Sequence, residues 1–262
     1  YREVERDSSY DFDFSFLNEK DKPFKSHFFS SLKKKIKFFS FDESDLTLNL
    51  QQTTNDSYLK SYKMESPLIE NDSLLTSFVE VNGYNDDLSF TADVRVYEDL
   101  TKPDRDRYEF VYPNYNLVKN YENISDLDGS FSLNSYGHVK QNNTNINEKI
   151  VINDLIFNSN SKILDGGIKN SYTFLIKNSN TNSSNSTEYK NSLDNKLDAI
   201  FQYKASLPLI KEDENFKNTL SPLMNFKYSP VPSKKNNIKS ATAELCQTQY
   251  NPSWAIVGSA SA

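Results

Sequence analysis

Residues 10–17 read "YDFDFSFL": Tyr or Phe takes positions 10, 12, 14 and 16, and Asp or Ser takes positions 11, 13 and 15. A period of two is that of a β-strand, whose successive side chains point to opposite faces of a sheet. This strand would therefore have one aromatic and one polar face. The first question that the sequence raises is what the aromatic face contacts.

The same alternation returns along the chain, in stretches separated by polar links. A sustained helical period is found nowhere, so we predict an all-β, antiparallel protein. Strands with clear alternation are expected at 46–51, 88–97, 127–135, 171–177, 197–207 and 220–230. Less regular strands are expected at 26–38, 74–84, 108–118 and 148–157.

The composition is polar but rich in aromatic residues. Only 36% of the residues are apolar and the mean hydropathy is −0.71, yet aromatic residues make up 13%. Disordered chains have few aromatic residues, so disorder does not explain the polarity, whereas strands that alternate throughout do. The net charge of −6 argues against nucleic acid as a partner. Cys246 is the sole cysteine, which excludes a disulfide within the chain.

The links between the expected strands differ in length. Short links are expected at 39–43, 84–87, 119–124 and 158–166, and longer ones at 18–25, 53–73, 99–107, 137–147 and 179–195. Because successive antiparallel strands run in opposite directions, counting them places most long links at one end of the sheet. Long loops at one end and short turns at the other are typical of outer-membrane barrels, whose strands also alternate between apolar and polar residues. We therefore predict an up-and-down transmembrane β-barrel fragment, open and partial, over residues 1–230. Residues 231–262 lose the alternation and are interpreted as an irregular tail of doubtful origin.

In a membrane barrel, apolar side chains face lipid and polar ones face a wet lumen. The lipid-facing candidates are Tyr10, Phe12, Phe14, Phe16, Phe90, Val94, Phe201, Tyr203 and Phe226. The lumen-facing candidates are Asp11, Asp13, Asp93, Arg95, Asp198, Gln202 and Lys204. The alternative is a soluble β-sandwich, whose strands alternate as well. The many Tyr and Phe on the apolar faces, and the charges in mid-strand on the polar ones, favour the barrel.

Three segments carry a resemblance to a known family. They are "TTNDSYLKSYKMES" at 53–66, "DRDRYEFVYPNYNL" at 104–117 and "YKASLPLIKEDENFKNTLSPLMNFKYSP" at 203–230. In order and spacing they resemble the barrel of LptD, the lipopolysaccharide-assembly outer-membrane protein family, also called organic solvent tolerance proteins. The matching positions are Asn55, Asp56, Tyr58, Leu59, Tyr62, Pro113, Tyr115, Pro208, Leu220, Pro222, Lys227, Tyr228 and Pro230.

The resemblance implies a location in the outer membrane of a Gram-negative bacterium. It also implies a function in transport, the insertion of lipopolysaccharide into the outer leaflet, and no chemistry on the substrate. The partners it implies are outer-membrane lipid and lipopolysaccharide, a plug lipoprotein and periplasmic bridge proteins. The alternatives are another outer-membrane barrel, such as a porin or receptor, and a soluble β-sandwich binding domain.

The sequence offers no motif of an enzyme. His27 and His138 are the only histidines, and neither stands beside a nucleophile or carboxylate signature. His27 is expected to be structural, and Tyr58 and Tyr62, which lie outside the strand pattern, are expected to pack in a loop. An esterase site assembled from a Ser, a His and a polar residue on separate strands stays open as an alternative. We expect neither a cofactor nor a metal.

Overall fold

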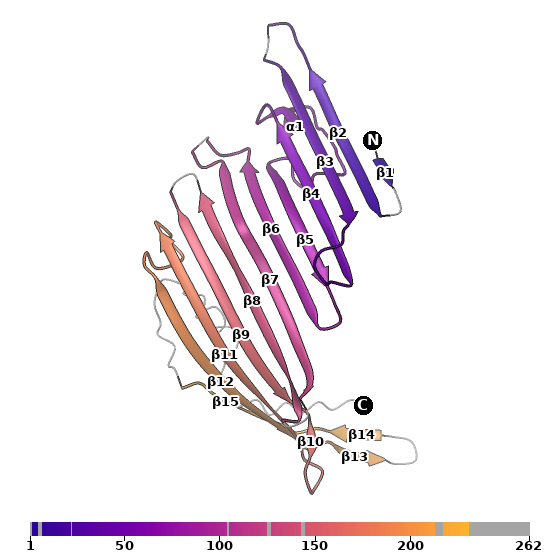
Figure 1. Ribbon diagram of the computed structural model, residues 1–262, viewed down its shortest axis with the longest axis vertical. Helices are drawn as coiled ribbons and strands as arrows, with labels where there is room; N and C mark the ends of the chain where they lie inside the picture. The colour runs from indigo at the N-terminus through magenta and orange to yellow at the C-terminus, as the bar shows by residue number, and fades with distance from the viewer. Residues whose placement is uncertain are drawn as a thin grey trace. The chain divides into compact units, whose positions relative to one another are not determined.

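The computed structural model describes residues 2–4, 7–21, 23–103, 105–124, 127–142, 145–212 and 217–230. Within these ranges the chain is almost entirely β-strand (Figure 1). One short helix, α1 (Tyr58–Ser61), interrupts the strands. The prediction of an all-β protein is therefore confirmed, and residues 231–262 lie outside the described residues.

The strands are long and follow one another closely along the chain. The strands before residue 100 are β1 (Arg2–Val4), β2 (Ser8–Leu17), β3 (Lys25–Lys35), β4 (Glu43–Thr53), β5 (Leu74–Tyr84) and β6 (Leu88–Asp99). The strands that follow are β7 (Tyr108–Ile124), β8 (Gly129–Asn142), β9 (Asn147–Ser159), β10 (Lys162–Ile163), β11 (Lys169–Ser184), β12 (Asp194–Ser206), β13 (Leu209–Glu212), β14 (Lys217–Leu220) and β15 (Leu223–Tyr228).

Most of these strands belong to one antiparallel up-and-down sheet. Its order is β1-β2-β3-β4-β5-β6-β7-β8-β9-β11-β12-β15, with β10 paired to β11, and β13 and β14 form a separate hairpin. The order ends at β1 and β15, so the sheet is open over the described residues. From β1 to β9, neighbours in the chain are neighbours in the sheet, as the sequence predicted for an up-and-down fold.

The chain divides into two compact units. The first contains Tyr1–Val118, Ser135–Val151 and Thr181–Leu193, and the second contains Lys119–Asn134, Ile152–Asn180 and Asp194–Ala262. The strands β7, β8, β9 and β11 each contribute residues to both units. The first unit contains β2–β6 and α1, whose side chains form most of the site described below.

Three expected links were wrong. Residues 119–124 continue β7 to Ile124, and most of the expected long link 137–147 is strand, because β8 continues to Asn142 and β9 begins at Asn147. The long link 179–195 begins later than expected, because β11 continues to Ser184. In each case the strand extends beyond the residues that alternate between apolar and polar, because hydrogen bonds to a neighbouring strand continue there.

The long link between β4 and β5 folds back on the sheet as a strap, which we define as residues 54–73. Its Tyr58 and Leu59 are buried with Phe29, Leu75 and Leu100 in one apolar cluster. The side chains packed against this cluster are Leu17, Met64, Leu68 and Ile69. A small core of the soluble kind therefore lies at the strap end of β2–β6.

Candidate functional site

The register of β2–β6 places the apolar side chains of five strands side by side. Directly paired residues of an antiparallel sheet point to the same face. One such row, which we call the apolar row, consists of Tyr10, Leu32, Leu48, Val79 and Val94. The same face carries Phe12, Phe14 and Phe16 on β2 and Phe90 on β6. The lipid-facing candidates on β2 and β6 thus share one face of the sheet, which we call the apolar face.

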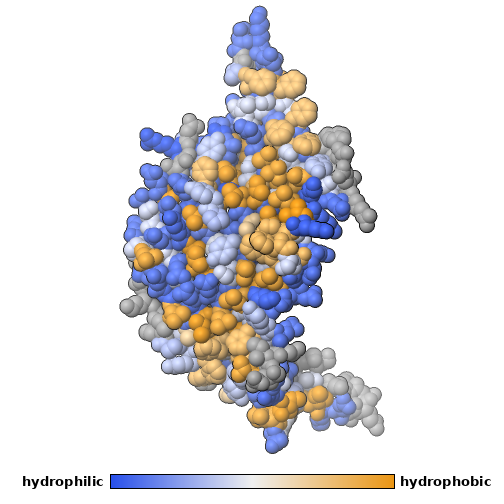
Figure 2. Space-filling view, in the orientation of Figure 1, coloured by the Kyte–Doolittle hydropathy of each residue, from blue (hydrophilic) through white to orange (hydrophobic). Residues whose placement is uncertain are grey.

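The apolar face is partly exposed and nowhere fully buried at the residues just named. Phe14 is 67% exposed, Val94 is 51% exposed and Val79 is 44% exposed. No second sheet covers these side chains in the described part of the chain, and hydrophobic residues lie at the molecular surface (Figure 2). The core of a soluble sandwich would bury such positions.

The opposite face, the polar face, is hydrogen-bonded and partly buried. Its polar row, offset by one residue from the apolar row, consists of Ser9, Lys33, Thr47, Glu80 and Asp93. The guanidinium of Arg95 lies 3.0 Å from Asp93 Oδ2 and 3.3 Å from Glu80 Oε2, and Asn114 donates a 2.7 Å hydrogen bond to Asp93 Oδ1. Asp93 is only 4% exposed, and these partners compensate for its loss of water.

The apolar positions move along the strands from one side of the sheet to the other. On β6 they span residues 88–96, with Ala92 at the midpoint, and on β2 they span residues 10–16, with Asp13 at the midpoint. The register joins Ala92 through Val81, Leu46 and Lys34 to Ser8, which is five residues short of Asp13. With about 3.4 Å per residue and about 4.8 Å between strands, the line through these midpoints deviates by about 40° from the perpendicular to the strands.

A polar cavity of about 610 Å³ lies over β6, β7, β8 and β9 within the first unit. Acidic side chains outnumber basic ones along its wall, and Tyr97, Tyr108 and Tyr189 add aromatic rings. The acidic residues are Asp93, Asp99, Asp106, Glu109, Glu148 and Glu188, and the basic ones are Arg95, Lys102, Arg107 and Lys140. Each of these basic side chains has a carboxylate partner, so the wall offers charges of both signs that are already paired.

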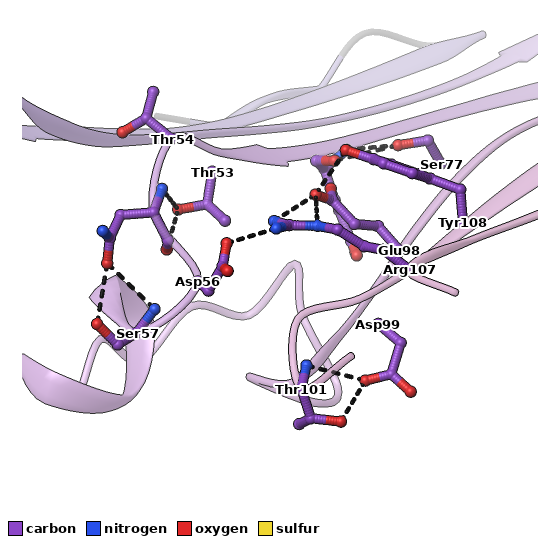
Figure 3. Close-up of polar contacts among 12 residues, drawn as sticks. Thr53, Thr54, Asp56, Ser57, Ser77, Glu98, Asp99, Thr101, Arg107 and Tyr108 are labelled. Carbon is purple, nitrogen blue, oxygen red and sulfur yellow. Dashed lines mark hydrogen bonds and ion pairs between the residues drawn. The ribbon is translucent and has the colours of Figure 1, made fainter. Parts of the chain in front are cut away.

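Arg107 holds the strap against the sheet (Figure 3). Its guanidinium lies 2.6 Å from Asp56 Oδ1 on the strap and 2.7 Å from Glu98 Oε1 on β6, and the hydroxyl of Tyr108 donates to the same Glu98 oxygen. Burial alone would lower the pKa of Arg107, but the hydrogen bonds with Asp56 and Glu98 outweigh it and raise the pKa. The guanidinium is therefore a permanent cation that joins two acidic groups far apart in the sequence.

A serine, a histidine and an aspartate meet beneath the strap. Ser15 Oγ lies 2.8 Å from His27 Nδ1 and 2.8 Å from the hydroxyl of Tyr58, and Asp13 Oδ1 lies 3.4 Å from His27 Nε2. His27 is 4% exposed, and its ring stacks on Phe29. The hydroxyl of Tyr58 is therefore a second hydrogen-bond partner of Ser15 beside His27. We interpret the group as a buried polar network that anchors the strap, in line with the structural role expected for His27.

The second unit repeats the division into two faces at the pairing of β12 with β15. Phe201 pairs with Tyr228 and Tyr203 with Phe226, while Gln202, on the other face, donates a 2.9 Å hydrogen bond to Asn225. Phe201, Phe226 and Tyr228 are exposed. Lys204 shares the face of Gln202, as does Asp198 by the alternation of the strand. In the same unit, Lys177 on β11 and Asp154 on β9 form a buried ion pair at 3.2 Å.

The motif positions of the resemblance have structural contacts. Asn55 Oδ1 accepts from the backbone and hydroxyl of Ser57 ahead of α1, and Tyr62 donates to Glu19. Tyr58 and Leu59 are buried, which confirms packing for Tyr58, whereas Tyr62 is exposed. Among the later positions, Tyr115 lies near Ser135, the carbonyl of Pro222 accepts from Leu207, and Pro113 and Pro230 are exposed. Sequence reasoning named Asp56 but missed its partner Arg107, whose only local signal is the run of alternating charges at 104–107, and it missed Glu98.

Comparison with models of known protein families gives no match, and no curated protein is significantly similar to the chain. Over the described residues, no helix has the length and hydropathy needed to span a membrane. In the same part of the chain, no cluster of three or more His, Cys, Asp or Glu side chains could hold a metal ion.

Proposed function

We propose that the chain forms part of the wall of an outer-membrane β-barrel that inserts lipopolysaccharide into the outer leaflet. In this proposal the apolar face contacts lipid and the polar face lines an aqueous lumen. The protein transports its substrate and does not transform it.

The observation that carries the proposal is the inverted burial of the two faces. Phe14, Phe16, Val79 and Val94 of the apolar face are exposed, whereas Asp93 of the polar face is buried. A water-soluble domain gains stability by the opposite arrangement. Acyl chains supply the missing cover for the apolar face, and a wet lumen tolerates the charges of the other.

The inclination of the apolar band supports the same reading. Strands of membrane barrels tilt by about 35–45° from the membrane normal. If the apolar band lies in the plane of the bilayer, its inclination equals the strand tilt, and the register gives about 40°. A lipid layer thus accounts for the shift of the apolar positions along the strands between β6 and β2. The core of a soluble sheet would not require such a shift.

The choice of lipopolysaccharide rests on the resemblance of the three sequence segments and on the character of the polar face. Its charged wall would suit the sugar and phosphate portion of such a molecule, while the acyl chains follow the apolar face. The resemblance further implies a plug lipoprotein and periplasmic bridge proteins as partners.

Lipid contact is tested by single cysteines labelled with an environment-sensitive fluorophore, in a Cys246→Ser background. Val79→Cys reports on the apolar face, and Thr47→Cys is its matched control on the polar face. In phospholipid vesicles, we expect spin-labelled lipid chains to quench the probe at 79 and to leave the probe at 47 bright. Equal accessibility of both probes to an aqueous quencher would support a soluble β-domain instead.

Substrate contact is tested in cells with a photo-reactive phenylalanine analogue at Tyr97 or Tyr189, which line the polar cavity. The proposal expects covalent adducts that react with antibodies to lipopolysaccharide. Lipid contact at Val79 without adducts at the cavity would indicate another outer-membrane barrel, such as a porin or receptor.

A further inference from the structure

The turn between β3 and β4, residues 36–42, exposes a phenylalanine in a strained conformation. Phe39 is 86% exposed, and its φ is 50°. A left-handed backbone is rare for a bulky side chain and persists only where the surroundings impose it. Neither the exposed ring nor the strained backbone is favourable in water, but a binding partner for the turn would explain both.

The turn is held in place by hydrogen bonds. The hydroxyl of Ser44 donates to the carbonyl of Ile36 at 2.6 Å and accepts from the backbone N–H of Phe38 at 3.2 Å. The N–H of Asp42 lies 2.6 Å from Asn85 Oδ1 in the neighbouring turn. The position of Phe39 is therefore imposed by the chain around it.

Three further rings form a platform under Phe39. Its ring meets that of Phe38 edge-on at 4.5 Å, and Phe38 and Phe41 each lie 6.3 Å from Phe90. Phe41 also covers Gly83, where an added Cβ would lie 2.5 Å from its ring. Gly83 pairs with Phe90 on the apolar face, so the platform continues that face to the end of the strands.

Charges of both signs surround the platform. Four exposed lysines and four exposed acidic residues lie at the adjoining ends of β3 and β4, in the turn between them and in the turn after β5. They are Lys33, Lys34, Lys35, Lys37, Asp42, Glu43, Asp86 and Asp87. This balance does not select an anionic surface, but it is complementary to headgroups that carry both a phosphate and an amine.

We propose that the Phe39 turn is a membrane anchor that inserts into the interfacial layer of a zwitterionic phospholipid leaflet. The inference rests on the proposed function, because the leaflet is the one that covers the apolar face. The turns at 36–42 and 85–87 are shorter than the strap at the opposite end of the strands, and short turns of outer-membrane barrels face the periplasm. The leaflet in question is then the inner one, which consists of phospholipid.

The anchor is tested with a fluorophore at Ser40→Cys in the Cys246→Ser chain, in vesicles of phosphatidylcholine and phosphatidylethanolamine. We expect quenching by lipids spin-labelled near the headgroup, and loss of most of it on Phe39→Asn, since Asn accepts the left-handed backbone but cannot insert. Phe24→Asn, at another exposed phenylalanine beside the opposite end of β3, serves as the matched control and should leave the quenching unchanged.

Each outcome decides the inference separately from the proposed function. A quenched probe at Val79 with an unquenched probe at Ser40 would refute the anchor and leave the membrane wall standing. A quenched probe at Ser40 alone would keep the anchor and refute the wall. Quenching at Ser40 that requires added anionic lipid would overturn the choice of a zwitterionic leaflet, and unquenched probes at both positions would refute both.

Discussion

The strap end and the middle of strands β2–β6 differ in which side chains they bury. At the strap end of β2–β6, Phe29, Tyr58 and Leu59 are buried together as in a water-soluble domain. Farther along these strands, Val79 and Val94 are exposed and Asp93 is buried. The register is continuous between the two regions on β2 and β3, so the change is not a change of fold.

The difference shows that the surroundings of each region, rather than the strand pattern, decide which face is covered. The strap brings its own apolar side chains and covers Phe29 and His27 on the polar face of β3. Away from the strap, the chain supplies no cover for the apolar face in the described residues. The strap end should thus be stable in water, and the middle of the strands should depend on lipid.

The largest effect is expected from removal of the strap's main anchor. Tyr58→Ala would empty the cluster around Phe29 and Leu75 and should lower the free energy of unfolding by about 3–5 kcal/mol, the usual cost of deleting a buried aromatic ring. The measurement is urea unfolding of the chain in phospholipid vesicles. Tyr58→Phe, which removes only the hydroxyl bonded to Ser15, should cost about 1 kcal/mol. Equal losses for both variants would show that the hydroxyl, not the ring, holds the strap.

The next effect separates lipid from water at the middle of the strands. Val79→Lys should lower the free energy of unfolding in vesicles by about 2–4 kcal/mol, the cost of a lysine on a lipid face near mid-bilayer. Thr47→Lys, one row away on the polar face and opposite Glu80, is the matched control and should be nearly neutral. If Val79 faced water, the substitution of this exposed side chain would change the stability by less than about 0.5 kcal/mol.

Alternation within the sequence was sufficient to predict the strands and the division of side chains between two faces. Phe12 and Asp13, or Val94 and Arg95, could be assigned to opposite faces because the period of two is a local property. The extension of β7 through Ile124 was not predictable in this way, since the neighbouring strand, not the alternation, determines where the ladder stops.

The site was less accessible to sequence reasoning than the fold. The contact between Asp56 and Arg107 joins segments that are distant in the chain, and no local period encodes it. The helix α1 consists of only four residues, too few to show a helical period, and is stabilised by burial of Tyr58 and Leu59. The partners of His27 likewise became visible only when the register placed Ser15 opposite it.

A smaller effect is expected where Arg107 fastens the strap. Arg107→Lys keeps the charge but loses the fork that reaches Asp56 and Glu98 together, so we expect a loss of about 1–2 kcal/mol in unfolding free energy. Proteolysis of the strap in vesicles should accelerate as well, because the strap opens more often. A Glu98→Gln variant with the same proteolysis rate as the wild type would argue that Asp56 alone matters.

The smallest effect is expected in the second unit, where Asp128 lies 2.8 Å from Lys162 Nζ and accepts from Asn160. These two hydrogen bonds lower the pKa of Asp128, and the bond to Asp128 raises the pKa of Lys162. Because the pKa of Asp128 is lowered, its contribution to the stability of the turn is fully present at pH values above the ordinary carboxyl pKa of 3.8. Because the pKa of Lys162 is raised, its contribution is fully present at pH values below the ordinary lysine pKa of 10.5.

Asp128→Asn retains an acceptor for Asn160 and tolerates the left-handed backbone at this position, where φ is 46°, but it removes the charge. Amide exchange of Asn160, whose N–H donates to the carbonyl of Asp128, should then be slightly faster than in the wild type at pH 7. The difference should disappear in acid, once the pH falls below the lowered pKa of Asp128 and the wild-type carboxyl takes up its proton. A difference in exchange rate that persists in acid would show that the geometry of the turn, and not the charge of Asp128, stabilises it. The turn would then resemble the strap end, which is stabilised by packing.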